Sequence, residues 1–169
     1  MSITSRLDAL DTATVLRRGI LVLATLGTVG AGMELLLLRH WSTGGMVVGW
    51  VDLAACLVAI VLAAGASERA IGGARWVAIA ALILAAAGIV LHVNGNWEAG
   101  PADGTLGAVW STLPLLERLW DAATGVVGKA PPLAPGALAE VSLLVLLATI
   151  RHPALARGRR DREVPAPAA

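Results

Sequence analysis

Four long apolar segments, separated by more polar connections, dominate the hydropathy pattern of this chain. They cover residues 19–38, 46–66, 76–93 and 135–150. A helix needs about 20 apolar residues to cross the roughly 30 Å hydrocarbon core of a bilayer. The fourth segment is the shortest, and the long side chain of Arg151 can extend it to the interface. The pattern predicts an all-α integral membrane protein, a bundle of four transmembrane helices.

The connections divide the chain into three parts. Residues 1–16 are predicted to be a cytoplasmic segment with the character of a short amphipathic helix, and residues 17–153 the four-helix transmembrane domain. Residues 154–169, rich in proline and alanine, are predicted to be a disordered cytoplasmic tail. A cytoplasmic turn over residues 67–74, containing Gly72-Gly73, makes the second and third helices an antiparallel hairpin.

The external loop of residues 94–134 is the longest connection. Within it, Thr112, Leu113-Pro114 and Glu117 are typical of a helix start and Gly125 of a helix end. We therefore expect one short amphipathic helix in the loop between the third and fourth spans. Its apolar stripe is expected to lie on the bilayer surface or to cap the bundle, and consists of Val109, Leu113, Leu116, Trp120 and Ala123.

Composition and charge support a membrane location. Hydrophobic residues make up 57% of the chain, charged residues 15%, and the mean hydropathy is +0.75, values outside the range of soluble domains. Arginines gather before the first segment, in the second connection and in the C-terminal tail. Because cytoplasmic loops carry an excess of Lys and Arg, the protein is expected to be multi-pass in the inner (plasma) membrane, with both termini cytoplasmic. The net charge of +1 indicates no nucleic-acid partner.

Each apolar segment contains one ionisable residue near the same predicted depth: Glu34, Asp52, His92 and Glu140. A charge at the centre of a membrane helix costs about 2.5–3.5 kcal/mol on insertion scales, so four of them suggest a shared site in the outer leaflet. All four follow small residues at helical spacing, on the faces by which membrane helices approach closely. These small residues are Gly27 and Ala31, Gly45 and Gly49, Ala85 and Gly88, and Gly136.

Three carboxylates in a medium of low dielectric need protons, a cationic His92, Arg39 or a bound cation as compensation. Oxygen ligands with one imidazole suit manganese, iron or zinc, so the residues predict a divalent metal site with Glu34, Asp52, His92 and Glu140 as ligands. Secondary ligands are expected at the outer end of the bundle: His40, Asn94, Asn96 and Glu98. A haem is disfavoured, because only His92 and His40 lie at a suitable depth and His40 falls off the Glu34 face.

Other functions stay open. Single polar residues near an interface also serve only to hydrogen-bond neighbouring helices. The chain is then an accessory subunit of a larger membrane complex, or a homo-oligomer joined through its G-x-x-x-G face. A small membrane enzyme using a carboxylate and His92 as acid and base is a further alternative. The sequence has no Walker loop, G-x-S-x-G, H-E-x-x-H or C-x-x-C motif, and its single cysteine, Cys56, allows no intrachain disulfide.

Three segments carry a resemblance: GMELLLLRHW from Gly32, LHVNGNWE from Leu91, and LAPGALAE from Leu133 with TIRHP from Thr149. With these segments the chain resembles small, uncharacterised four-helix bacterial inner-membrane proteins. The resemblance covers most of the predicted transmembrane domain. It implies the architecture and no particular activity.

Overall fold

The computed structural model describes residues 11–41, 46–131 and 133–156. Over these residues the chain is all-helical and contains no strand. The α-helices are α2 (Thr12–Leu37), α3 (Val47–Ala63), α4 (Glu68–Ala99), α5 (Leu115–Thr124) and α6 (Leu133–Ala148). Two short 3-10 helices, Gly100–Ala102 and Trp110–Thr112, lie between α4 and α5. The order agrees with the prediction of four apolar helices and one short helix before the last of them.

Local signals set the helix ends. Asp11 caps α2 by accepting a hydrogen bond from the backbone N–H of Ala13 at 2.8 Å, and Ser67 caps α4 by accepting one from Ala70 at 3.1 Å. Such caps satisfy backbone donors that the first helical turn leaves unpaired. The helix α5 ends at Gly125, whose φ of 73° is the left-handed conformation that favours glycine. Gly125 is therefore the stop that the sequence predicted.

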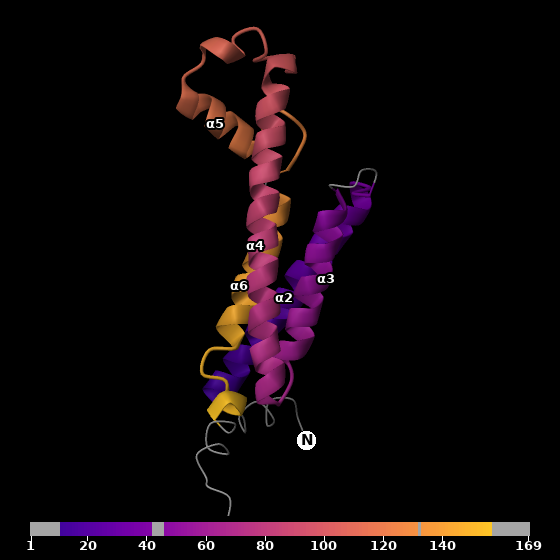
Figure 1. Ribbon diagram of the computed structural model, residues 1–169, viewed down its shortest axis with the longest axis vertical. Coiled ribbons are helices and arrows are strands. Elements are labelled where there is room, and N and C mark those ends of the chain that lie inside the picture. The colour runs from indigo at the N-terminus through magenta and orange to yellow at the C-terminus, as the bar shows by residue number, and fades with distance from the viewer. Residues whose placement is uncertain (1–10, 42–45, 132, 157–169) are drawn as a thin grey trace, which may run out of the picture.

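Four helices pack lengthwise around one core. The helix α4 lies between α3 and α6, α2 lies against α6 and α3, and α3 also contacts α6 across the centre. Figure 1 shows α4 and α6 side by side, with α2 and α3 diverging from them toward the end where α5 lies. The core is rich in alanine, including fully buried Ala24, Ala59, Ala78 and Ala81. Small residues in the core allow the helix backbones to approach closely.

Large apolar side chains point outward instead. Two helical stretches are long and apolar enough to cross a membrane, Thr12–Leu37 and Glu68–Ala102, and only 22% and 17% of their most apolar windows are buried. Exposed side chains on α2, α3, α4 and α6 include Leu26, Leu37, Val61, Ile83, Val90 and Leu143. The core helix of a soluble domain would bury such residues.

The helix α4 is longer at both ends than the predicted third span. Its 32 residues correspond to about 48 Å. Because the helix includes Gly72-Gly73, the prediction of a turn over residues 67–74 is wrong. The cap at Ser67 starts the helix earlier, and the chain turns within residues 64–67. At the other end the helix continues to Ala99, because Val93 and Trp97 are held under a small second core of Trp110, Ala122 and Val127.

On α5, Arg118 contacts α4 and Asp121 and Ala122 are buried, whereas Leu116, Glu117 and Trp120 are exposed. The Arg118 guanidinium lies over the Trp97 ring, 4.9 Å from its centroid, and Asp121 is buried. Leu116 and Trp120, from the predicted stripe, are 80% and 69% exposed. The stripe therefore does not cap the core of the four long helices.

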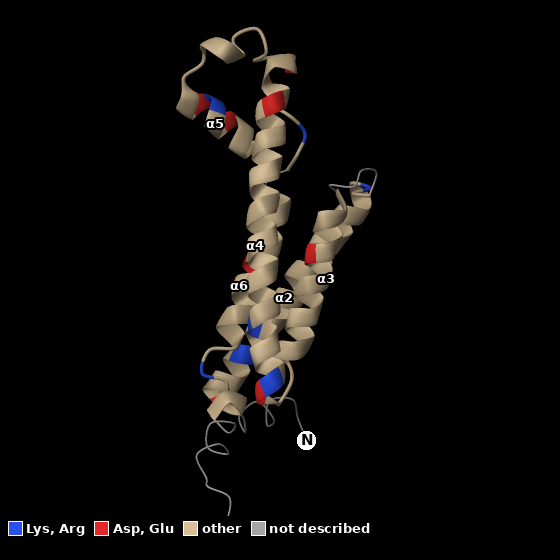
Figure 2. Cartoon of the chain, in the orientation of Figure 1, with Lys and Arg blue, Asp and Glu red and all other residues tan. Residues whose placement is uncertain are grey.

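Basic residues gather at the end of the structure opposite α5. Arg17 donates from Nε to the Ala148 carbonyl at 3.0 Å, and Arg75 donates from Nη2 to the Thr149 carbonyl at 2.8 Å. Both arginines thus satisfy carbonyls at the C-terminus of α6, where the helix dipole also favours a cation. Figure 2 shows blue residues collected near this end and few charges along the middle of the long helices.

The two terminal segments of the predicted organisation are only partly described. Residues 1–10, most of the predicted N-terminal amphipathic segment, lie outside the described residues, and Thr12 already belongs to α2. Most of the predicted tail, residues 157–169, also lies outside them. The described part of the tail forms a helical turn over residues 153–156.

Candidate functional site

A pocket of about 690 Å³ opens between the helices, at the end away from Arg17 and Arg75. It is bounded by the end of α2, the start of α3, the middle of α4 and the start of α6. The segment of residues 129–131 closes one side. Most lining residues are apolar, among them Ala31, Leu35, Leu84, Leu91, Pro135 and Leu138. Five ionisable residues join them: Glu34, His40, Asp52, His92 and Lys129.

His40 reaches the pocket because α2 ends in a tight turn. Arg39 has a φ of 49°, and the backbone N–H of His40 donates to the Leu35 carbonyl at 2.9 Å. Trp50 of α3 donates from its indole Nε1 to the His40 carbonyl at 2.8 Å. His40 is therefore anchored through its backbone, and its ring is left for the pocket.

The rings of His40 and His92 lie close together, with centroids 6.2 Å apart and an angle of 59° between their planes. Burial lowers the pKa of His40 first, the nearby His92 lowers it further, and Glu34 acts in the opposite sense. The sequence predicts His40 only as a secondary ligand, because it lies beside Arg39 and Trp41 at the expected interface and off the Glu34 face of α2. The turn at Arg39 removes it from that helical periodicity and directs it inward.

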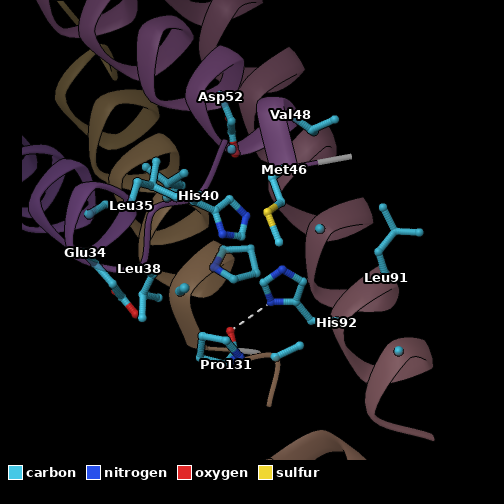
Figure 3. Close-up of a pocket in the computed structure, with 18 of the residues that line it drawn as sticks. Glu34, Leu35, Leu38, His40, Met46, Val48, Asp52, Leu91, His92 and Pro131 are labelled. Carbon is cyan, nitrogen blue, oxygen red and sulfur yellow. Dashed lines mark hydrogen bonds between the residues drawn. The ribbon is translucent and has the colours of Figure 1, made fainter. Parts of the chain in front are cut away.

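His92 has a defined tautomer in its neutral form. Its Nδ1 lies 2.9 Å from the carbonyl oxygen of Pro131, which Figure 3 draws as a dashed line. A carbonyl can only accept a hydrogen bond, so Nδ1 carries the hydrogen. The other ring nitrogen, Nε2, is then a hydrogen-bond acceptor or a base.

Asp52 is the most buried charged residue of the pocket. It is 2% exposed, and among the described residues its Oδ1 atom has no hydrogen-bond partner. In Figure 3 the side chains of Asp52, Met46 and His40 point toward the same space, with His92 on its far side. Burying a carboxylate without a partner is costly, so this atom is the strongest sign of a ligand in the structure.

Glu34 also lines the pocket, as the sequence predicted, but at its margin. Its side chain is half-buried, and in Figure 3 its carboxyl end lies beside Leu38, apart from the two imidazole rings. Gly27 and Ala31, the small residues that precede Glu34 on its face of α2, pack against the neighbouring helices. A Cβ added to Gly27 would lie only 3.0 Å from Val141 of α6, so α6 lies directly against this face.

Glu140 lies outside the pocket, apart from the other three residues of the predicted site. Its side chain is exposed, and a Cβ on Gly136, one turn before it, would meet nothing within 4 Å. The helix α6 instead packs through Leu138, Val141 and Val145. These larger side chains fill the space between the alanine-rich faces of the neighbouring helices, which turns the Gly136–Glu140 face outward.

The three secondary residues on α4 also lie outside the pocket lining. Asn94 donates from Nδ2 to Glu98 Oε1 at 2.9 Å on the exposed surface. Asn96 is buried and donates to the carbonyls of Ala122 at 3.0 Å and Ala130 at 2.8 Å. It holds residues 129–131 in place beside His92, and is thus a positioning residue for the pocket wall.

The predicted four-residue metal site is not assembled among the described residues. No group of three His, Cys, Asp or Glu there is placed to hold a metal ion. The physical reasons are the outward turn of Glu140 and the position of Glu34 at the margin. What the pocket brings together is two imidazoles and one buried carboxyl group in an apolar chamber.

The sequence did not predict three contributors to the pocket: Met46, Lys129 and Pro131. Met46 stands at the start of α3 in the apolar pattern. Pro131 belongs to the proline-rich exit of the external loop, and only the fold shows that its carbonyl meets His92. One turn beyond Asp52 on α3, Cys56 packs against Ser142 of α6 with Sγ and Oγ 3.6 Å apart.

No family model, curated protein or solved structure matches this chain. The resemblance to small four-helix bacterial membrane proteins therefore stays a prediction.

Proposed function

We propose that this chain is a multi-pass membrane protein whose four-helix bundle binds a small, mostly hydrophobic molecule between α2, α3, α4 and α6. The observation that carries the proposal is the pocket of about 690 Å³ with the unpartnered Oδ1 of Asp52 at its wall. Ligand pockets usually measure about 300–1,000 Å³ and combine an apolar lining with a few polar groups.

The membrane location rests on the distribution of side-chain size. Alanine fills the core, while leucine, valine and isoleucine lie exposed on α2, α3, α4 and α6. In water this arrangement would leave a very large apolar surface uncovered. In lipid it is favourable, since small residues let helices approach and large ones face the acyl chains. The helices α3 and α6, with 17 and 16 residues, are short spans that tolerate local thinning of the bilayer.

The proposed orientation places the α6 C-terminus, Arg17 and Arg75 in the cytoplasm and the pocket in the outer leaflet of the inner membrane. It is supported by the basic residues at that end of the helices and by the positive-inside rule. C-terminal fusions test it, because green fluorescent protein folds in the cytoplasm and alkaline phosphatase is active only outside it. Activity of the phosphatase fusion would contradict this orientation.

Binding is tested by filling the pocket. Gly95 lines it, and a Cβ there would meet nothing within 4 Å, so Gly95→Trp places a large ring in the chamber without a backbone clash. Gly30 is a matched control, because it is also helical and open to space but lies outside the pocket. We expect native mass spectrometry of the purified protein to detect a co-purified small molecule in the wild type and in Gly30→Trp, and much less of it in Gly95→Trp.

The same preparations test the alternatives. Stoichiometric manganese, iron or zinc in the wild type, lost in a Glu34→Ala/His92→Ala variant, would establish a cation site in place of the organic ligand. A stable protein partner with an empty pocket would favour the accessory-subunit role. Equal amounts of co-purified molecule in Gly95→Trp and Gly30→Trp would remove the support for the pocket as the binding site.

A further inference from the structure

The buried carboxyl group of Asp52 lacks a donor in its surroundings. Its Oδ1 has no hydrogen-bond partner among the described residues, and the residue is 2% exposed. It lies on α3 between Gly49, which also lines the pocket, and Cys56, which packs against α6. A carboxylate in such a place needs a cation or a strong donor beside it.

Three donors of the described residues on α3, α6 and α4 are already engaged. The Trp50 indole Nε1 donates to the His40 carbonyl, and Ser142 Oγ lies 3.0 Å from the Leu138 carbonyl, to which it donates. The Nδ1 hydrogen of His92 is directed at the Pro131 carbonyl. The ring of His40 faces the same space, but no hydrogen bond joins it to Asp52 Oδ1, so we take the donor for this atom to come from the contents of the pocket.

Apart from the His40 ring, which has one donor and one acceptor nitrogen when neutral, the polar groups left over in the described lining are mainly acceptors. Asp52 and Glu34 provide carboxyl oxygens, and neutral His92 provides the lone pair of Nε2. Lys129 is the one lysine or arginine in the described lining, and its side chain is exposed at the edge. With two carboxylates and one ammonium group, the lining favours a positively charged occupant over an anion.

The rest of the lining selects an apolar body. Ala31, Leu35, Leu84, Leu91 and Leu138 surround the space between the carboxylates and the histidines. A bare metal ion would leave these side chains without a partner, and the described carboxylates and imidazoles do not form a group that could hold one. A hydrophobic molecule with one charged end matches both parts of the lining.

We propose that the pocket binds a lipophilic amine, with its protonated nitrogen hydrogen-bonded to Asp52 and its hydrocarbon body between α2, α4 and α6. This inference rests on the proposed function, because it names the class of molecule that the same pocket takes. The amine donates to Asp52 Oδ1, and His92 Nε2 is the second acceptor within the chamber.

Three probes of equal chain length test the amine: dodecylamine, 1-dodecanol and dodecanoate, titrated onto the detergent-purified full chain at about pH 7.5 and followed by native mass spectrometry. Charge-assisted hydrogen bonds are worth more than neutral ones, so we expect dodecylamine to bind at least about tenfold more tightly than dodecanol. Dodecanoate should bind most weakly. The wild type alone can thus decide the preference, whether or not a variant folds.

Variants then assign the preference to one carboxyl group. The Asp52→Asn variant should lose the preference for dodecylamine over dodecanol. It should still bind dodecanol, because the amide keeps the shape of the pocket. Glu140→Gln is the matched control, since Glu140 is a carboxylate on α6 outside the pocket, and it should keep the preference. Thermal unfolding checks that both variants are folded.

The outcomes separate the two levels of the proposal. If dodecanol binds the wild type as tightly as dodecylamine, or if folded Asp52→Asn keeps the preference, the amine inference is overturned and the binding pocket stands. If the wild type binds none of the three probes, and Gly95→Trp has no effect on co-purified molecules, the proposed function itself is overturned.

Discussion

Asn96 and Ala130 are paired like two residues of a backbone ladder: Asn96 Nδ2 donates to the Ala130 carbonyl at 2.8 Å, and the Ala130 N–H donates to Asn96 Oδ1 at 3.0 Å. The Asn96 side chain thus satisfies both backbone groups of Ala130, in the loop that returns from α5 to α6. Gly128 permits this close approach, because a Cβ there would collide with the Asn96 side chain. Pro131, one residue beyond the pair, is thereby held against His92.

Replacing Asn96 with alanine should destabilise the fold by about 1–3 kcal/mol, because buried backbone groups of Ala122 and Ala130 lose their partners. Thermal unfolding in detergent measures the loss. Asn94→Ala is the control, because Asn94 is exposed and pairs only with Glu98 among the hydrogen bonds described. Similar melting temperatures for the two variants would contradict the role given to Asn96.

Enlarging the alanine face of α4 should separate the helices. Ala85 is 1% exposed, so Ala85→Leu forces extra methylenes into a closed space at a cost of about 1–3 kcal/mol. Ala86, the next residue, is exposed, and Ala86→Leu should change stability by no more than about 0.5 kcal/mol. Denaturant unfolding in mixed micelles compares the pair, and an equal effect of both would show that α4 does not pack as described.

The fold should lose stability in mild acid through His40. The folded-state pKa of His40 is lowered from 6.5 by burial and by His92, with Glu34 opposing, so the unfolded chain binds the proton more readily. The contribution of neutral His40 to the free energy of unfolding is therefore complete above about pH 6.5, and it is lost as the pH falls toward the folded-state pKa.

His40→Gln should reduce this loss, measured as the difference in melting temperature between about pH 7.5 and about pH 5.5. His152→Gln, at the other end of the structure, controls for the removal of a histidine. A wild-type-like acid sensitivity of His40→Gln would show that other groups are responsible.

The outward face of α5 should be in contact with lipid. Leu116 and Trp120 are exposed although they form the apolar side of the helix. Because the chain has one cysteine, and Cys56 is buried, a nitrobenzoxadiazole label attached to Leu116→Cys reports on a single site. We expect blue-shifted emission in nanodiscs, compared with the same label on Glu117→Cys. Equal emission from both would leave this face in water and favour a protein partner there.

The hydropathy pattern was sufficient to predict the helices, because burial of long apolar segments needs no knowledge of their neighbours. It located four apolar helices and the short α5 with its stop at Gly125. It also identified the small-residue faces of α2, α3 and α4 that form the core, since Ala31, Cys56 and Ala85 are all buried.

The tertiary structure decided which polar residues share the pocket. Helical periodicity places Gly136 and Glu140 on one face of α6, but the direction of that face depends on the competing fit of Leu138, Val141 and Val145 against the other helices. The turn at Arg39 brought His40 inward, and the Asn96 pairing brought Pro131 to His92. The Asn96 and His92 contacts join residues far apart in the chain, and the local spacing of residues along one helix carries no information about such contacts.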